Sequence, residues 1–332
     1  MKNKGLKITL IVLLSIVALA LIAVMIFAIL NKSLDLKVSL IKFGDNTEMI
    51  FQNEYNPEQF ENINIDASSS NVRIEKGNTD KIKVTAYGDK DDRIAENISE
   101  NELLISKESS KIYIFTFLYW CNEEIIIEIP DDCTKNFTIN TSSGDITAPN
   151  LETSNIQFIT SSGKITCGNI NNGELNSSSG DIKVGDGNEL TINTSSGEIQ
   201  TGNLKLLNAS ASSGDIEVGT IEETNLKTSS GKITVNSSNR IQAECSSGDI
   251  RINNIGNYCS LKSTSGNIEI NTLNITENSS IEAKSGNVRI NSKNDIYVET
   301  QTGSGDADVE NNNRKAEIVL DITTTSGNID VK

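Results

Sequence analysis

Residues 178–218 read SSGDIKVGDGNELTINTSSGEIQTGNLKLLNASASSGDIEV, and this stretch decides the fold. It contains three Ser-Ser-Gly triplets, and their glycines, Gly180, Gly197 and Gly214, follow one another at intervals of 17 residues. The residues between the triplets alternate between apolar and polar side chains, which is typical of β-strands with one buried face. A fixed period of this length predicts a structural unit that stacks on copies of itself.

The same unit recurs over most of the 332 residues, because eleven Ser-Gly dipeptides occur at spacings of 17 to 22 residues. Their glycines are Gly144, Gly163, Gly180, Gly197, Gly214, Gly231, Gly248, Gly266, Gly286, Gly305 and Gly327. Residues 135–332 are therefore predicted to form the regular part of the fold, with these glycines as its structural repeat positions.

Two apolar columns accompany the glycines. The residues two positions after them are Ile146, Ile165, Ile182, Ile199, Ile216, Ile233, Ile250, Ile268, Val288, Ala307 and Ile329. The residues five positions before them are apolar in every repeat except the one with Thr300. Each repeat therefore holds two short strands, and a unit of 17 residues cannot bury its own apolar face. The sequence predicts an all-β fold, a single-chain parallel β-solenoid with about 17 residues and two strands per coil.

A crowded inward corner is predicted three residues before each glycine, where the side chain is small in all eleven repeats. We expect the glycine to supply a positive φ for the bend and the serines to hydrogen-bond the turn backbone. The same register is found earlier in the chain, with Ser70 in place of the glycine, so the first coil is expected to begin near Phe60. Residues 60–134 are interpreted as irregular N-terminal coils with an aromatic cap.

Residues 8–30 carry no charge and are long enough to cross a bilayer as one helix. Lys2, Lys4 and Lys7 precede them, so the positive-inside rule places residues 1–7 in the cytoplasm and the solenoid outside it. A cleaved signal peptide is the alternative, although the apolar run is longer than a typical signal core. Residues 31–59 are expected to be a short membrane-proximal segment. The predicted location is the cell membrane, with a single pass.

Composition excludes several classes of function. The net charge of -16 disfavours nucleic acid as a partner, because phosphate contacts require basic residues. The chain contains no histidine, so Ser-His and Cys-His catalysis and histidine-ligated metal sites are impossible. No cofactor is expected.

The strand Ile125–Pro130, followed by Phe137–Ile146 and the Ser-Ser-Gly-Asp-Ile ladder, resembles a bacterial β-strand-repeat family of unknown function. Its members are labelled as adhesins, are membrane-anchored, and in the LiaG-like type belong to envelope-stress operons. The resemblance covers residues 60–332 and the N-terminal anchor. It implies the fold strongly, whereas the family offers no catalytic or binding residues to transfer.

Aromatic residues gather in one stretch, with Tyr113, Phe115, Phe117, Tyr119 and Trp120 close together. This stretch is interpreted as a layer that seals the membrane-proximal end of the solenoid, with a partner-binding patch as the alternative.

Cys121 and Cys133 flank one strand outside the regular coils and are candidates for a disulfide in an oxidising exterior. Cys167, Cys245 and Cys259 fall in inward columns and are predicted to be buried thiols.

Two surface columns could carry chemistry. The position after each glycine is often Asp or Asn, which suggests calcium, but interrupting lysines and too few oxygen ligands favour a turn role instead. The column three residues after each glycine includes Lys183, Glu217, Arg251, Glu269, Arg289, Asp308 and Asp330. An enzyme that processes cell-wall glycans would place carboxylates there, yet mixed signs along a whole column are more typical of a solvated face.

The sequence thus predicts a non-enzymatic, membrane-anchored, extracytoplasmic interaction module, an adhesin or an envelope-stress accessory protein. Its expected partners are the membrane, through residues 8–30, and a cell-wall polymer or an envelope protein. A glycan-processing β-helix enzyme and a purely structural spacer remain the alternatives.

Overall fold

The computed structural model describes residue 22 and residues 47–108, 122–151, 155–310 and 312–332. Within these residues no helix is both long and apolar enough to span a bilayer. The predicted membrane segment 8–30, apart from Ile22, and the aromatic residues of 113–120 lie outside the described part of the chain. The predictions made for them therefore stay predictions.

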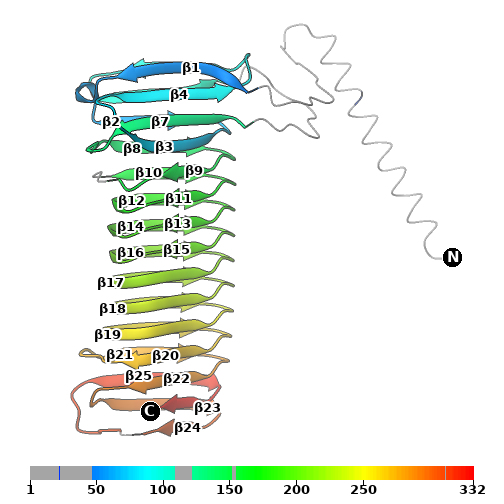
Figure 1. Cartoon of the computed structure of the whole chain (residues 1–332). Coiled ribbons are helices and arrows are strands. Elements are labelled where there is room, and N and C mark those ends of the chain that lie inside the picture. The colour runs from blue at the N-terminus through cyan, green and yellow to red at the C-terminus, as the bar shows by residue number, and fades with distance from the viewer. Residues whose placement is uncertain (1–21, 23–46, 109–121, 152–154, 311) are drawn as a thin grey trace, which may run out of the picture.

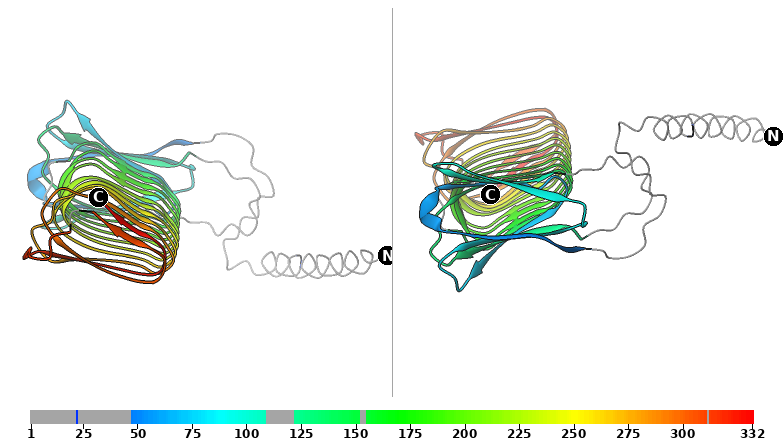
Figure 2. Two further views of the ribbon diagram at one scale, coloured as in Figure 1. Left: turned by 90° about the horizontal axis from the view of Figure 1, so that it is seen from below. Right: turned by 90° about the horizontal axis from the view of Figure 1, so that it is seen from above.

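The described residues form a parallel β-solenoid, a rod of stacked coils shown from the side in Figure 1 and along its axis in Figure 2. This confirms the predicted fold. Each coil contributes two strands. The strand that follows the repeat glycine belongs to what we call the post-glycine sheet, and the strand that precedes it belongs to the pre-glycine sheet.

The strands of the post-glycine sheet that lie wholly within it are β3 (Asn71–Gly77), β9 (Ile146–Ala148), β11 (Ile165–Cys167), β13 (Ile182–Val184), β15 (Ile199–Thr201), β20 (Ile268–Leu273), β22 (Val288–Ser292), β24 (Ala307–Val309) and β26 (Ile329–Val331). Those of the pre-glycine sheet are β2 (Asn62–Asp66), β8 (Asn136–Thr141), β10 (Ile156–Thr160), β12 (Ile170–Ser177), β14 (Gly187–Thr194), β16 (Leu204–Ala211), β21 (Ser279–Ala283), β23 (Tyr297–Ser304) and β25 (Val319–Ser326). The corner of the coil that has no repeat glycine, where the post-glycine strand turns into the pre-glycine strand, is called the far corner. Three long strands continue through it and belong to both sheets. They are β17 (Ile216–Thr228), β18 (Ile233–Cys245) and β19 (Ile250–Ser263).

The apolar columns form the core, as predicted, except that Ala307 of the Gly305 coil is exposed. In the post-glycine sheet Ile182 pairs with Ile199, and Ile199 pairs with Ile216, so equivalent residues stack directly. All three side chains have a relative exposure of 0%. Because a one-residue slip would turn every one of these side chains outward, their alignment fixes the register of the sheet.

The glycines are required by close packing between coils. A Cβ built on Gly197 would lie 2.0 Å from the carbonyl oxygen of Gly180, and one on Gly214 would lie 1.7 Å from that of Gly197. No side chain fits at such distances. The expected positive φ is wrong for this ladder, because among the described glycines only Gly305 has one, at 145°. The corner bends with ordinary backbone angles, and the glycines are needed because the next coil is so near.

Small hydroxyl side chains link the glycines of neighbouring coils. The Thr160 hydroxyl donates to the Gly144 carbonyl at 3.1 Å and accepts the Gly163 N–H at 3.1 Å. Ser177 repeats the pattern one coil later, between the Gly163 carbonyl and the Gly180 N–H. The predicted small corner is therefore a relay that satisfies two buried backbone groups in most coils that carry a hydroxyl there. The exceptions are Thr302 and Thr324, whose hydroxyls donate to the glycine carbonyl of their own coil.

The N-terminal end is closed by one outermost coil and by three antiparallel strands that leave the coil path. The strands of this end are β1 (Glu48–Tyr55), β4 (Ile82–Gly88), β5 (Arg93–Ile98), β6 (Glu102–Glu108) and β7 (Glu124–Pro130), with a 3-10 helix, η1 (Pro57–Gln59), after β1. β6 and β7 form a coil outside the one made by β2 and β3, which in turn stacks on β8 and β9. The antiparallel strand β5 then covers the edge of β6, β4 covers the edge of β7, and β1 pairs with β4.

The C-terminal end also departs from simple sequential stacking. β25 lies between β21 and β23, and β26 lies between β22 and β24. The last coil of the chain, with Gly327, is therefore inserted between the coils of Gly286 and Gly305. Figure 1 shows this non-sequential order at the foot of the rod. At both ends, therefore, the order of the coils along the rod differs from their order in the sequence.

The glycine ladder gives a first prediction. Gly214→Ala should lower the free energy of unfolding by about 3 kcal/mol or more, because its methyl group would overlap the neighbouring carbonyl. In the control variant Gly77→Ala, the new Cβ would meet its nearest neighbour at 3.5 Å, so a change of less than about 1 kcal/mol is expected. Urea denaturation of both variants measures the difference. Equal stabilities would contradict the close-packing explanation.

The inward and outward assignment gives a second prediction. Ile216→Asp should be severely destabilising, by more than about 4 kcal/mol, because it buries an unpaired carboxylate in the core. Glu217→Lys, at the exposed neighbouring position, should change stability by about 0.5 kcal/mol or less. Thermal unfolding followed by circular dichroism compares them, and similar melting temperatures would refute the assignment.

Candidate functional site

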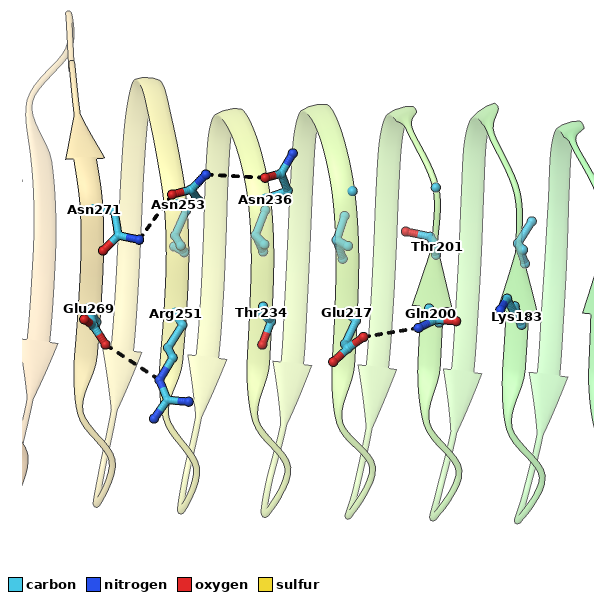
Figure 3. Close-up of a pocket in the computed structure, with 16 residues that line it drawn as sticks. Lys183, Gln200, Thr201, Glu217, Thr234, Asn236, Arg251, Asn253, Glu269 and Asn271 are labelled. Carbon is cyan, nitrogen blue, oxygen red and sulfur yellow. Dashed lines mark hydrogen bonds and ion pairs between the residues drawn. The ribbon is translucent and has the colours of Figure 1, made fainter.

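An open groove runs along the post-glycine sheet, parallel to the rod axis, with a volume of about 680 Å³. We call it the axial groove. It crosses consecutive coils from Lys183 to Glu269, which at about 4.8 Å per coil amounts to roughly 24 Å. Figure 3 shows that its side chains stand in rows across the strands, because the coils repeat in register.

The first row of the axial groove holds the outward residues three positions after each glycine. They are Lys183, Gln200, Glu217, Thr234, Arg251 and Glu269. Neighbours interact along the row, since the Gln200 amide donates to the Glu217 carboxylate at 3.2 Å and the Arg251 Nε lies 3.7 Å from the Glu269 carboxylate. Two cationic and two anionic side chains balance each other here, although the whole chain is strongly acidic.

The second row is made of amides. Asn253 donates to Asn236 at 3.4 Å, and Asn271 donates to Asn253 at 3.2 Å, which forms a ladder of exposed side-chain amides. In the two preceding coils the same row is occupied by Gly202 and Gly219, which leaves the groove without a side chain there. The row therefore offers amide donors and acceptors at one end and bare backbone at the other.

Glycine at this row has a local structural cause. A Cβ on Gly202 would lie 2.4 Å from Oδ1 of Asp186, and that oxygen accepts the N–H of Asn203 at 2.6 Å. The Asp186 side chain thus occupies the space beside the strand in order to bind the next coil. The hollow of the groove is a consequence of the hydrogen-bond ladder at the far corner.

The Asp and Asn column after the repeat glycines, considered above for calcium, binds backbone. Oδ1 of Asp145 accepts the Lys164 N–H at 2.8 Å, and Oδ1 of Asp215 accepts the Lys232 N–H at 2.8 Å. The Lys164 ammonium lies 2.9 Å from the Asp181 carboxylate, and this hydrogen bond lowers the pKa of Asp181. Among the residues described, no group of three or more metal-binding side chains comes together.

The cysteines of the regular coils are buried, as predicted. Burial raises the pKa of Cys167 and of Cys259 to about 12, so both thiols are protonated and act as small core residues. Cys245 replaces the hydroxyl of the corner relay, since its Sγ accepts the Gly248 N–H at 2.9 Å and donates to the Gly231 carbonyl at 3.1 Å.

The remaining predicted site residues do not belong to the regular coils. Cys133 is a buried thiol whose pKa is raised by burial. Cys121 lies outside the described residues, so the Cys121–Cys133 disulfide stays a prediction. The residues of the predicted aromatic patch also lie outside the described residues, so the patch stays a prediction. They are Tyr113, Phe115, Phe117, Tyr119 and Trp120.

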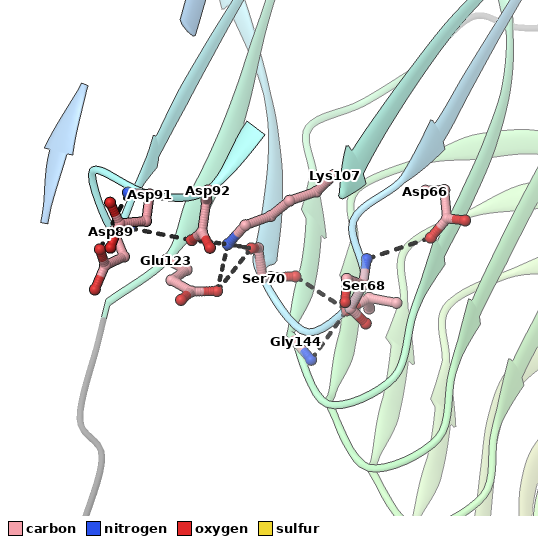
Figure 4. A network of polar contacts seen from close by, with 10 residues as sticks. Asp66, Ser68, Ser70, Asp89, Asp91, Asp92, Lys107, Glu123 and Gly144 are labelled. Atoms are coloured by element: carbon pink, nitrogen blue, oxygen red, sulfur yellow. Dashed lines mark hydrogen bonds and ion pairs between the residues drawn. The ribbon is translucent and has the colours of Figure 1, made fainter. Parts of the chain in front are cut away.

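The structure also reveals a buried charge cluster that the repeat pattern did not indicate (Figure 4). The Lys107 side chain has 3% exposure, and its ammonium lies 3.1 Å from the Asp92 carboxylate and 2.5 Å from the Glu123 carboxylate. It also donates to the Ser70 hydroxyl at 3.0 Å. The available signal was the alternation of β6, in which Lys107 follows Leu103 and Ile105 at inward positions.

The chain is similar, at low identity and low TM-score, to three solved bacterial structures. One from Bacteroides fragilis, described as a "putative adhesin", is 12% identical over 85% of this chain and 96% of its own, with a TM-score of 0.35. One from Parabacteroides distasonis, described as a "putative lipid binding protein", is 18% identical over 89% of this chain and all of its own, with a TM-score of 0.36. A "putative cell adhesion protein" from Clostridium sporogenes is 14% identical over 86% and 99%, with a TM-score of 0.20. No curated protein matches the chain.

A family model settles the classification. It matches twice, at residues 60–218 and at residues 185–332, and the two matches together cover the solenoid from the first predicted coil to the last residue. They also account for more than half of the chain. The family model thus describes the same repeat that the Ser-Gly ladder defines, and the chain belongs to the Toastrack DUF4097 family.

Proposed function

We propose that this protein is a non-enzymatic interaction module, held at the cell membrane by residues 8–30, whose solenoid binds a neutral wall polymer along the axial groove outside the cytoplasm. The observation that carries the proposal is the pair of rows in the groove. The first row is polar in every coil, and in the second row an asparagine amide recurs in register over three successive coils, as a repeating ligand would require.

The groove suits an extended glycan better than a compact ligand. It is open and elongated, and the step between coils is comparable with the length of one sugar unit in an extended chain. Sugar hydroxyls can pair with the amides of Asn236, Asn253 and Asn271 one after another. Each contact is weak, but contacts made in series by one polymer raise the overall affinity.

Charge supports a neutral ligand. The protein carries a net charge of -16, which repels anionic polymers, whereas the first row of the groove balances Lys183 and Arg251 against Glu217 and Glu269. The groove is therefore a locally neutral strip on an acidic rod.

The anchor follows from the N-terminal sequence, in which three lysines precede the uncharged run of residues 8–30. The first strand described, β1, belongs to the closed end of the rod. A chain anchored just before it would present the coils, and the groove along them, away from the membrane. An envelope-stress role would use the same geometry with a membrane protein as partner.

Two alternatives are weaker on the same geometry. A retaining or inverting glycosidase needs two carboxylates about 5 to 10 Å apart. Glu217 and Glu269 of the groove are three coils apart, or about 14 Å, which favours binding over hydrolysis. A purely structural spacer would make no use of the groove at all.

The third prediction tests the groove. Full-length protein in mild detergent should bind isolated cell-wall polymer saturably, and the triple variant Asn236→Ala, Asn253→Ala, Asn271→Ala should bind about tenfold more weakly or worse, because three amide contacts are lost. Co-sedimentation with the wall polymer measures both affinities.

The matched control lies on the pre-glycine sheet of the same coils. Lys227→Ala, Glu244→Ala, Lys262→Ala removes three exposed residues and should leave binding unchanged. A further variant lacking residues 113–120 tests the aromatic patch. Loss of binding in that variant alone would move the site to the patch. Capture of a membrane protein without any wall binding would favour the envelope-stress role.

A further inference from the structure

Lys107 lies where the solenoid corner meets its N-terminal cap. It is one residue beyond the Asp66–Ser106 pair that joins β2 to β6, and it points over Ser70, which takes the place of a repeat glycine. Regular coils have only a small side chain at this inward corner. Since β6 belongs to the outermost coil, no further coil of the described residues occupies the space above it, and a long side chain fits.

The ammonium of Lys107 is enclosed by two carboxylates. The Asp92 side chain is 9% exposed and the Glu123 side chain is 16% exposed, so all three groups are largely removed from water. Gly88 permits this approach, because a Cβ there would lie 3.1 Å from the Asp92 carboxylate and 3.4 Å from the Lys107 nitrogen. A lysine amine that has given up its proton is a nucleophile, and the fold holds the Lys107 nitrogen against a carboxyl group.

The carboxyl group of Asp92 is positioned for attack by the Lys107 nitrogen. It sits in the tight turn between β4 and β5, where its N–H donates to the Asp89 carbonyl at 2.8 Å. Its Oδ2 accepts the Asp89 N–H at 3.1 Å and also faces the Lys107 nitrogen at 3.1 Å. The backbone donor polarises the carboxyl group and would stabilise negative charge on it during attack.

Glu123 is placed to move the protons. Its Oε2 contacts the Lys107 nitrogen at 2.5 Å and accepts the Ser70 hydroxyl at 3.3 Å. A carboxylate at this distance can accept a proton from the lysine and return it to a departing hydroxyl group.

We propose that Lys107 and Asp92 condense into an intramolecular isopeptide bond, with Glu123 as the proton carrier. The Lys107 nitrogen forms a bond to Cγ of Asp92, the bond from Cγ to one carboxyl oxygen breaks, and that oxygen leaves as water with protons passed on by Glu123. The ion pair becomes a neutral amide, and neither an oxidant nor a further reactant is needed. The groups are held in contact by the fold, which supplies the proximity that the reaction requires.

The bond would change the cap in a defined way. β5 and β6 are an antiparallel pair, and Asp92 and Lys107 lie at its open end, next to the Arg93–Glu108 pair. The cross-link would close this hairpin covalently, shrink the conformational freedom of its unfolded state, and remove two buried charges.

The mass of the intact full-length chain tests the proposal, and this is the fourth prediction. Folded protein should be lighter than its sequence mass by one water molecule, whereas Lys107→Arg should have the full mass expected for its sequence. Trypsin digestion of the natural chain should yield a branched peptide that joins residues 91–93 to residues 94–111.

Two further variants fix the assignment. Lys83→Arg alters another lysine paired with a glutamate, at 2.9 Å but partly exposed, and should still lose one water. Glu123→Gln should cross-link to a smaller extent, since an amide cannot accept the proton. A natural chain of full sequence mass would overturn the proposal, and a branch at residue 123 would overturn the choice of Asp92.

Discussion

The structure depends on the contact between glycines of successive coils, where the carbonyl oxygen of one coil occupies the place that a Cβ of the next would need. This approach brings the backbones of neighbouring coils together at one corner of the rod. The corner hydroxyls and the Asp and Asn ladders then find their backbone partners at fixed positions. The glycine contact and the apolar columns require the same register, because a shift of one residue would place a side chain against a carbonyl group and turn the apolar side chains outward.

The same constraint shapes the surface. Because every coil repeats in register, outward residues form straight rows. Each outward position of the repeat therefore becomes a row of side chains along the rod axis. The axial groove combines a charge-balanced row with an amide row. Its second row has no side chain at two coils, because a Cβ on Gly202 would meet the Asp186 side chain and one on Gly219 would meet the Gly202 carbonyl. A repeat fold of this kind presents polar side chains at regular intervals along the rod, which suits binding of a polymer better than binding of a single small molecule.

The periodic part of the fold could be predicted from sequence, since the register is encoded locally. Ile182, Ile199 and Ile216 stack as their spacing indicated, Ser70 replaces a repeat glycine, and Cys245 takes a corner position. The role of the glycines was predicted incorrectly, because spacing reveals that a residue must be small but not which atom crowds it. The end topology and the Lys107 cluster were also beyond reach, since both depend on pairings between distant segments where the repeat is blurred. Of the axial groove, the sequence indicated only the outward column of mixed charge and not the hollow beside it.

The inserted C-terminal coil has a consequence for how the molecule is made. The coil of Gly305 has no strand partner among the described residues other than β25 and β26, which lie at 319–332. This coil can therefore join the rod only after residues 319–332 have been synthesised and have stacked on the coil of Gly286. A chain cut short before residue 319 would leave the strands of the Gly305 coil without a neighbour, even though the preceding coils could already stack.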